Sequence, residues 1–237
     1  MTNSLNVDII GYISSCFSEK FGTPRQPGLV PSAEARLSLV EPFNREEMVR
    51  GLEEFSHIWV HFLFHQVMAE GWKATVRPPR LGGNQRKGVW ATRSPHRPNF
   101  MGLSVVQLKG IEFNHGVELL LAGVDLLDGT PVIDIKPYLV SSDSIEGASE
   151  GWAVHEFDKL EVDFSAEAAK FCADYEGETG VPLLQLITQV LREDPRPPSQ
   201  RQKKESFGMR IYEVNVRWRM SDAGCRVISC EKTGQRS

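Results

Sequence analysis

The chain has 237 residues, of which 41% are apolar, and its formal net charge at pH 7 is −4. This length and apolar content are typical of one large folded domain, or of a large and a small one. The weak acidic charge excludes a general affinity for nucleic acids, so binding of that kind requires a local basic patch.

The cysteines and the hydropathy pattern favour a cytoplasmic protein. The four cysteines are scattered, form no C-x-x-C pair and follow no signal peptide, which is typical of free thiols in a reducing compartment. The longest apolar stretch, residues 58–64, is too short to cross a bilayer. We therefore expect neither a membrane span nor a metal site.

The first 140 residues carry the pattern of short β-strands. Several segments alternate between apolar and polar positions, and residues 114–116 form a hairpin-turn signal between two of them. No long helical period separates most segments, which argues against a doubly wound parallel sheet and favours a β-barrel or a sandwich. One or two helical turns are expected over residues 45–54. The expected strands lie at residues 7–13, 36–40, 57–64, 88–91, 103–109, 117–124 and 132–136.

The second half of the chain changes character. Ser165 is a candidate N-cap for one helix, and Pro182 is a candidate first residue for another. A closing hairpin over residues 212–230 has one apolar and one polar face. The expected apolar stripe of the second helix is Leu183, Leu184, Ile187, Val190 and Leu191. We predict a mainly β protein with an N-terminal β-barrel (residues 1–140), a linker (141–160) and a small C-terminal α+β domain (161–237).

The motifs of several large enzyme classes are absent. No G-x-G-x-x-G follows an expected strand, and no Walker loop or G-x-S-x-G elbow occurs. His57, His61 and His65 recur every four residues, but the apolar residues between them indicate a strand rather than a helix. A metal site formed by these histidines is conceivable, and hydrogen bonds to the backbone are the interpretation we favour.

Residues 91–104 contain the most informative motif of the chain. Two arginines, a serine, a histidine and an asparagine lie within seven positions, interrupted by Pro95 and Pro98. Because proline fixes φ and lacks a backbone donor, we predict a stiff polar loop between two strands. Such a loop either pairs its arginines with carboxylates or binds a ligand.

Two further loops have a composition typical of binding sites. Residues 24–28 form a polar turn bracketed by prolines, for which a plain loop is the simpler interpretation. Residues 77–87 contain four cations in eleven positions. This second segment is either a solvated loop or a contact for an RNA backbone.

The strand expected near residue 134 places an acid, a cation and a phenol on one face. Asp134, Lys136 and Tyr138 alternate with apolar residues after the turn signal Asp128-Gly129. The three side chains form either an ion pair beside a tyrosine or the lining of a pocket.

Together these segments resemble the TsaA-like family, the TrmO-type tRNA N6-adenosine methyltransferases. The matching segments occur in the family's order and span almost the whole chain, including a C-terminal domain typical of the longer bacterial members. They lie at residues 25–29, 50–53, 77–84, 91–104, 125–139, 194–197 and 215–219.

The resemblance implies a β-barrel that binds S-adenosylmethionine without a Rossmann fold. It also implies a homodimer whose cofactor site lies near the barrel–barrel interface. The implied substrate is adenosine 37 of threonine tRNA, already carrying a threonylcarbamoyl group, and its N6-methylation gives m6t6A. The residues that resemble the family's cofactor contacts are Pro24, Arg25, Gln26, His65, Gln66, Arg93, Leu103, Asp128, Gly129, Thr130 and Pro131.

Methyl transfer from a sulfonium is an in-line displacement, and the N6 proton must pass to a base. We hypothesise that Asp134 or Tyr138 lies in the reacting pocket and that Lys136 steadies the carboxylate of the threonylcarbamoyl group. The expected tRNA contacts are Arg77, Arg80, Arg86, Lys87, Arg196, Arg217 and Arg219.

Two other functions are compatible with these residues. The protein is either a methyltransferase with the same cofactor and a different RNA or small-molecule substrate, or a non-catalytic barrel that only grips RNA phosphates. Binding of S-adenosylmethionine separates the last of these from the enzymes. Nucleoside mass spectrometry of tRNA separates the two enzymes.

Overall fold

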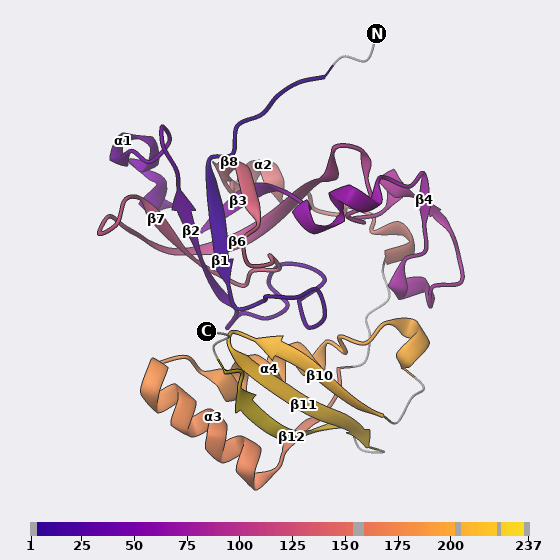
Figure 1. The fold of residues 1–237 in the computed structure, drawn as a ribbon. Coiled ribbons are helices and arrows are strands. Elements are labelled where there is room, and N and C mark those ends of the chain that lie inside the picture. The colour runs from indigo at the N-terminus through magenta and orange to yellow at the C-terminus, as the bar shows by residue number, and fades with distance from the viewer. Residues whose placement is uncertain (1–3, 154–158, 202–204, 222–223, 235–237) are drawn as a thin grey trace.

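Six strands close into a barrel in the N-terminal part of the chain (Figure 1). The structure is a computed structural model that describes residues 4–153, 159–201, 205–221 and 224–234. The order of the strands around the barrel is β1-β2-β7-β6-β3-β8, and every neighbouring pair is antiparallel. These strands are β1 (Gly11–Ser15), β2 (Glu34–Leu39), β3 (His57–Leu63), β6 (Met101–Glu112), β7 (Glu118–Ala122) and β8 (Pro131–Pro137).

Alternation of side chains along the strands fills the barrel. In β3, Ile58, Val60 and Phe62 are buried inside the barrel, while His57 and His61 lie on its outer face. The register shifts between His61 and Phe62 against β8, and again in the pairing of β6 with β7. Irregularities of this kind bend strands and help a sheet to close. The predicted mainly β fold with an N-terminal barrel is confirmed.

The strand order places three long connections at one end of the barrel. Because each strand is antiparallel to its neighbours, β1, β3 and β7 run in the same direction. The connections that follow them, residues 16–33, 64–100 and 123–130, therefore share one end, which we call the loop end. The connections at residues 40–56 and 113–117 lie at the opposite end, where the chain also leaves β8.

The connection from β3 to β6 contains little regular structure. It holds β4 (Thr75–Val76), β5 (Lys87–Gly88) and several 3₁₀ turns. The strand expected over residues 88–91 is wrong beyond Gly88, because Val89–Ala91 form a 3₁₀ turn. The Val89 N–H donates to the Ala74 oxygen, and both the N–H and the hydroxyl of Thr92 donate to the Val89 oxygen, which ends the ladder.

Short helical segments lie at the opposite end of the barrel and in the expected linker. α1 (Glu46–Val49) and a 3₁₀ turn at Leu52–Glu54 confirm the helical turns expected over residues 45–54. The linker contains α2 (Val140–Asp143) and a 3₁₀ turn at Gly151–Ala153. Residues 154–158 of the linker lie outside the described part of the chain.

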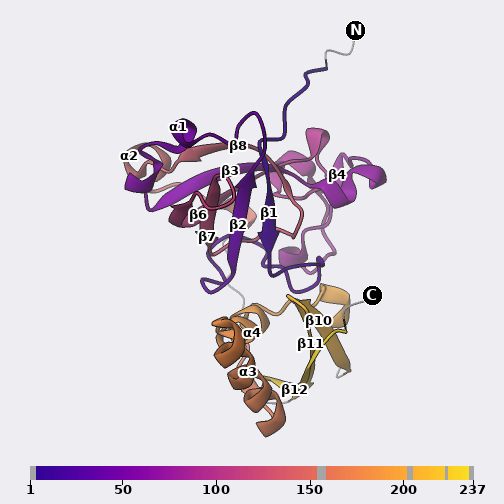
Figure 2. The same ribbon diagram turned by 60° about the vertical axis from the view of Figure 1, so that its left-hand side comes forward.

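The C-terminal unit is a four-stranded sheet with two helices on one face (Figure 2). Ser165 caps the first helix by accepting the Ala168 N–H at 3.1 Å, as predicted. In the second helix Leu186 is buried and Leu184 is exposed, so the expected stripe is wrong at Leu184. The elements are β9 (Val162–Phe164), α3 (Ala166–Thr179), α4 (Leu183–Arg192), β10 (Ser206–Ile211), β11 (Val214–Ser221) and β12 (Gly224–Lys232), in sheet order β10-β11-β12-β9.

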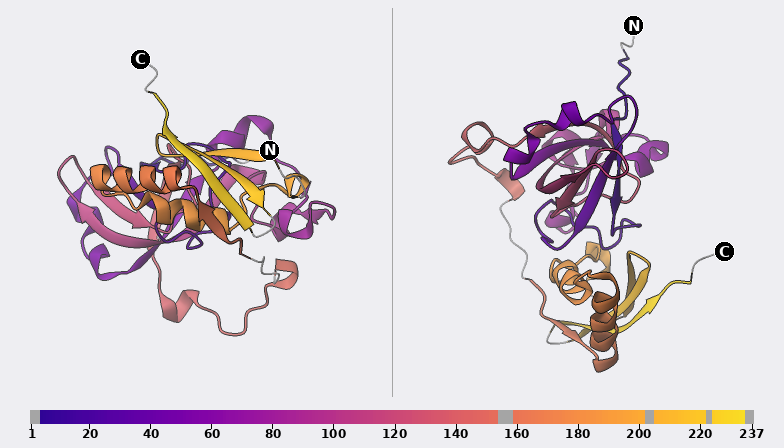
Figure 3. Two further views of the ribbon diagram at one scale, coloured as in Figure 1. Left: turned by 90° about the horizontal axis from the view of Figure 1, so that it is seen from below. Right: turned by 90° about the vertical axis from the view of Figure 1, so that its left-hand side faces the viewer.

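The C-terminal unit packs against the loop end of the barrel (Figure 3). The Tyr212 N–H donates to the Cys16 oxygen at 2.8 Å, and the Arg210 N–H donates to the Glu19 carboxylate at 2.9 Å. The N–H and hydroxyl of Ser32 both donate to the side chain of Gln189 on α4. The chain leaves the barrel at its opposite end and returns to the loop end through the linker. No helix in the described part of the chain is long and apolar enough to span a membrane.

Candidate active site

The loop end of the barrel gathers most residues predicted to bind the cofactor. Residues 24–26 lie in the connection after β1, and residues 128–131 lie in the connection after β7 and at the start of β8. His65, Gln66 and Arg93 lie in the connection after β3. These connections share one end of the barrel, so the fold brings together residues that are up to about a hundred positions apart.

Two of the three connections are joined through Gln26. The guanidinium of Arg93 donates to the side-chain oxygen of Gln26, and the Gln26 amide donates to the backbone oxygen of Arg25. Arg93 is exposed, whereas Arg25 and Gln26 are half-buried. Hydrogen bonds within the protein therefore order the polar groups of the predicted cofactor loop around Gln26. The guanidinium of Arg93 remains exposed to solvent.

A half-buried carboxyl beside this pair, that of Asp125, was missed by the sequence reasoning. Asp125 accepts a hydrogen bond from the Ser104 hydroxyl at 2.7 Å, and Ser104 is buried in the barrel. Burial raises the pKa of Asp125 to about 6, although the Ser104 hydrogen bond and the charge of Arg93 both act to lower it. Both residues lie within the family-like segments, where they stand at the end of residues 91–104 and at the start of residues 125–139. Their position in these segments is the signal that could have found them.

The turn at residues 128–131 is held firmly against β1. The Asp128 carboxylate accepts the Ser15 N–H at 3.0 Å, and the Gly129 N–H donates to the Ile13 oxygen at 2.8 Å. Gly129 has a φ of +73°, which favours glycine because it has no Cβ. Thr130 is buried, and its oxygen accepts the Ile13 N–H. The turn thus offers an exposed carboxylate on a fixed backbone.

The stiffness predicted for residues 91–104 has a physical basis in the structure. The N–H groups of Ser94 and His96 donate to the hydroxyls of Thr92 and Ser94, which makes two successive side-chain turns. Asn99 and Phe100 have φ angles of 65° and 53°, a conformation that costs energy for residues with a Cβ. Strained backbone of this kind concentrates at functional sites.

The three predicted reacting residues lie on the outer face of the barrel and do not converge. Asp134 and Lys136 are exposed and lie opposite His61 and Trp59 of β3. The ring of Tyr138 packs against that of Trp59, with centroids 5.8 Å apart. At about 3.3 Å per residue, Tyr138 lies roughly 13 Å beyond Asp134 toward the opposite end. Asp134 is therefore the candidate nearest the loop end.

Leu103, a predicted cofactor contact, belongs to an exposed apolar strip on β6. Leu103 and Met101 are 46% and 42% exposed, and both lie on the outer face of the barrel. They pair with His61 and Leu63 of β3. Met101 and Leu103 thus form a small apolar patch on the outer face of the barrel.

A cationic loop, by which we mean residues 71–90, lies in the connection after β3. Two exposed tryptophans lie near its two ends. Residues 71–90 contain five cations and no acid. Arg77 and Arg86 are exposed, Lys87 is half-buried, and the side chain of Arg80 lies outside the described part of the structure. Trp72 and Trp90, which the sequence reasoning did not single out, are 59% and 78% exposed. Tryptophans of this kind have a face available for stacking.

The predicted C-terminal cations divide into an exposed and a buried group. Arg217 and Arg219 are exposed on the face of the sheet that the helices leave open, as their alternation with buried Val216 and Trp218 requires. The same face carries exposed Arg210 and Arg226, which were not predicted.

Arg196 is only 3% exposed, and its guanidinium binds the Asp194 carboxylate. In this structure its guanidinium therefore pairs within the protein, and its role as a tRNA contact stays a prediction.

The fold and the site define a two-domain protein that builds its binding loops on a closed β-barrel rather than on a parallel sheet. The family model described as the tRNA-methyltransferase O N-terminal domain matches residues 12–144, and the TrmO C-terminal domain matches residues 158–233. The chain belongs to the tRNA-methyltransferase O family, which confirms the resemblance seen in the sequence.

Individual relatives agree with this assignment. The chain is 46% identical over 234 residues to an Escherichia coli protein named tRNA (adenine(37)-N6)-methyltransferase, covering 97% of this chain and 99% of that one. It is 45% identical over 219 residues to a Pseudomonas aeruginosa protein named as a putative S-adenosylmethionine-dependent methyltransferase, with 92% and 93% covered. The crystal structure of TrmO from Pseudomonas aeruginosa superposes with a TM-score of 0.82 at 38% identity, covering 98% of this chain and 100% of that one.

Proposed function

We propose that this protein methylates N6 of threonylcarbamoyladenosine at position 37 of threonine tRNA and so forms m6t6A. Its coarser activity, S-adenosylmethionine-dependent methylation of adenine N6 in tRNA, follows from its family and from near-complete coverage of its relatives. The observation that carries the proposal is the meeting of the three cofactor-like connections at one end of the barrel, in the same loop system as the cationic segment. The reaction belongs in the cytoplasm, where tRNA is modified.

The residues at the loop end match the chemistry of S-adenosylmethionine. The cofactor carries a carboxylate, two cationic centres and a hydroxyl-bearing ribose, so its site needs both donors and acceptors. Exposed Arg93 offers a donor for the carboxylate, while exposed Asp128 and the rigid backbone of residues 128–131 offer acceptors. When bound, the cofactor supplies an electrophilic methyl group on sulfonium. Residues 24–26, His65, Gln66 and Leu103 complete the proposed contacts.

The chain must also take a proton from the substrate. As the bond from N6 to the methyl carbon forms and the bond from that carbon to sulfur breaks, the N6 proton passes to a base. The carbamoyl group makes this N–H urea-like and more acidic than an ordinary exocyclic amine. We propose that Asp134 or Tyr138 accepts the proton, and the geometry favours Asp134. Exposed Lys136 would then face the carboxylate of the threonylcarbamoyl group.

Two exposed basic surfaces support tRNA as the substrate. The first is the cationic loop with exposed Arg77 and Arg86, to whose segment Arg80 and Lys87 also belong, and the second is the open face of the C-terminal sheet with Arg217 and Arg219. Both lie on a chain whose total charge is −4, so the positive charge is local rather than general. Local patches of this kind bind phosphates, and the recognised base supplies specificity.

We also propose that the protein acts as a homodimer. The exposed strip with Met101 and Leu103 lies on the outer face of the barrel, and Leu103 itself resembles a cofactor contact of the family. A second barrel seated there would cover the strip and enclose the site.

Nucleoside mass spectrometry tests the proposed reaction. We expect tRNA from a strain that lacks this gene to lose m6t6A and accumulate t6A, and purified protein with S-adenosylmethionine to restore m6t6A. Loss of a different methylated nucleoside, with m6t6A intact, would assign the enzyme another substrate. Calorimetry that detects no binding of S-adenosylmethionine to the folded protein would reject the methyltransferase and favour an RNA-binding barrel.

A further inference from the structure

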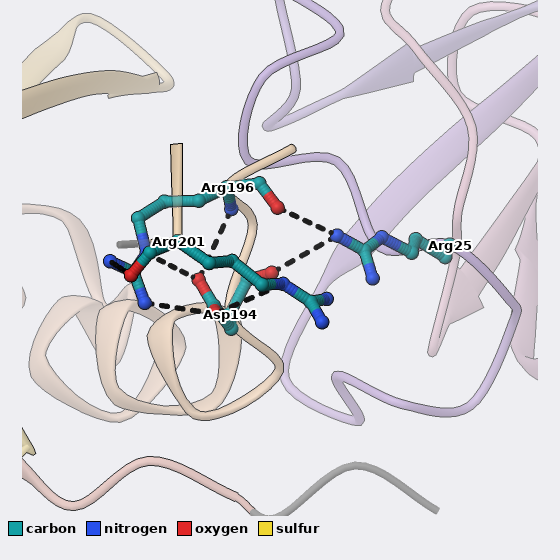
Figure 4. A network of polar contacts seen from close by, with 4 residues as sticks. All are labelled: Arg25, Asp194, Arg196 and Arg201. Carbon is teal, nitrogen blue, oxygen red and sulfur yellow. Dashed lines mark hydrogen bonds and ion pairs between the residues drawn. The ribbon is translucent and has the colours of Figure 1, made fainter. Parts of the chain in front are cut away.

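One residue of the cofactor-like loop connects the barrel to the C-terminal unit. The Nη2 group of Arg25 donates to the backbone oxygens of Asp194 and Arg196, both at 3.1 Å (Figure 4). Arg25 is half-buried and lies between Pro24 and Gln26, in the middle of the loop. The conformation of this loop therefore depends on a turn about 170 residues further along the chain.

The turn that accepts these bonds is rigid. The Asp194 carboxylate accepts from Nε and Nη2 of Arg196 at 2.7 and 3.0 Å, and also from the Arg196 N–H at 3.3 Å. Asp194 has a φ of +44°, and prolines follow both it and Arg196. A further guanidinium nitrogen of Arg196 donates to the Arg201 oxygen. This buried bidentate pair orients the two carbonyl groups that Arg25 binds.

The same contacts continue from Arg25 into the candidate site. The Gln26 side chain donates to the Arg25 oxygen and accepts from Arg93, whose charge acts on Asp125. Across the interface, residues of the loop and of the C-terminal unit line one small pocket of about 20 Å³. Because Arg25 is hydrogen-bonded to both carbonyl groups of the turn, a displacement of the turn is transmitted to the loop through this side chain.

We propose that the Asp194–Arg196 turn is a positioning element for the cofactor loop, with Arg25 as its tether. The C-terminal unit would then have two roles: an exposed face for tRNA and a buried turn that sets the geometry of cofactor binding. The identity of the cofactor rests on the proposed function, but the tether itself does not. Because coupling between sites is reciprocal, cofactor binding at the loop should also order the turn.

Hydrogen exchange on the full-length protein without ligand tests the tether. We expect Arg25→Ala and Asp194→Ala each to speed amide exchange in residues 22–28 by about tenfold, the effect of losing one or two hydrogen bonds. The double variant should be no faster than Arg25→Ala, because both changes break one path. Lys159→Gln is the matched control, since it removes an exposed ion pair with Glu193, next to the turn, and leaves the tether intact.

Calorimetry with S-adenosylmethionine tests the link to the cofactor. We expect Asp194→Ala to raise the Kd about tenfold, within the usual range of coupling between sites, and Arg25→Lys to lose less affinity than Arg25→Ala. Saturating cofactor should slow exchange in residues 194–201 of the wild type. The affinity of Asp194→Ala for tRNA should stay within about twofold of the wild type, which separates positioning from a general loss of structure.

Two results would overturn the proposal. The proposed role of Arg25 as a tether is wrong if amide exchange in residues 22–28 of Arg25→Ala stays within twofold of the wild-type rate. If Asp194→Ala does not fold, the result for Arg25→Ala alone tests the tether. The link to the cofactor is wrong if Asp194→Ala loosens the loop but binds S-adenosylmethionine as the wild type does. Failure of the proposed function looks different, because the wild type itself would then bind no cofactor while the exchange result still stands.

Discussion

Two carboxyl groups of the barrel lie in opposite surroundings. Asp125 is half-buried beside Ser104 and close to Arg93, whereas Asp134 is exposed on the outer face of β8. Burial disfavours the charged form of Asp125, and exposure leaves Asp134 available to a substrate. Of the two carboxyl groups, Asp134 is therefore the one that we propose as the base, and Asp125 belongs to the framework beneath the loops.

The raised pKa of Asp125 predicts a pH-dependent stability. Burial raises this pKa from 3.8 to about 6, so between pH 4 and 6 the folded state holds a proton that the unfolded state has lost. The free energy of unfolding should therefore fall as pH rises through this window, by up to about 3 kcal/mol from this group. Asp125→Asn should lack that contribution. Urea unfolding of both proteins at pH 4.5 and 7.5 measures the difference, and an equal gap at both pH values would contradict it.

The position of Asp134 predicts unequal effects for the two candidate bases. We expect Asp134→Asn to slow single-turnover methylation about a hundredfold or more, the usual contribution of a positioned base. Tyr138→Phe should keep a rate close to that of the wild type, because the Tyr138 ring packs on Trp59 toward the opposite end of the barrel. Rapid-quench measurements with saturating cofactor and tRNA report this rate directly. Normal rates in both variants would remove both residues from the reaction.

At the scale of elements, the strand patterns located the six barrel strands, although β1 begins at Gly11 rather than at the expected residue 7. It failed where pairing depends on distant partners: β9 is a three-residue strand that joins β12 in parallel, and β10 follows a segment without a clear pattern. Residues 88–91 look like a strand, but Val89 bonds to Ala74 and turns the chain. Local patterns cannot show such bonds.

The sequence identified the loops of the candidate site but not the tertiary contacts beneath these loops. Family-like segments identified residues 24–26, Arg93 and residues 128–131, which the fold brings to one end of the barrel. Arg196 looked like a surface cation because the segment around it has the composition of a basic turn. Only the tertiary structure shows that Arg196 is buried against Asp194. Ser104 and Asp125 were overlooked for the same reason, since their contact joins β6 to the connection that follows β7.

The close packing of β3 and β6 predicts a strict requirement for glycine at position 102. A Cβ on Gly102 would overlap the ring of Phe62, which fills the barrel interior and is 5% exposed. We expect Gly102→Ala to destabilise the protein by about 1–3 kcal/mol, the usual cost of overpacking. Gly88→Ala is the control, because nothing lies within 4 Å of the corresponding Cβ. Thermal unfolding of the two variants compares them, and equal melting temperatures would contradict the packing argument.

At the scale of the whole molecule, positive charge gathers in two places, although Glu70 and Asp163 each pair with one of these cations. The segment of residues 71–90 contains five cations, no acid and two exposed tryptophans, and the open face of the C-terminal sheet carries four exposed arginines. An anticodon loop offers both phosphates and unstacked bases. Cations bind the former in a salt-dependent way, whereas aromatic rings stack on the latter.

This difference predicts two distinguishable effects on tRNA binding. Arg86→Ala should reduce the slope of log K against log salt by about one, as the loss of one phosphate contact does. Trp90→Ala should weaken binding by about 1–3 kcal/mol at every salt concentration and leave the slope unchanged, because stacking releases no counterion. Arg36→Ala is the control for charge, since Arg36 is exposed but pairs with Glu112 and Glu118. Filter-binding titrations at several salt concentrations distinguish the cases, and a slope that falls in Trp90→Ala or stays constant in Arg86→Ala would contradict these roles.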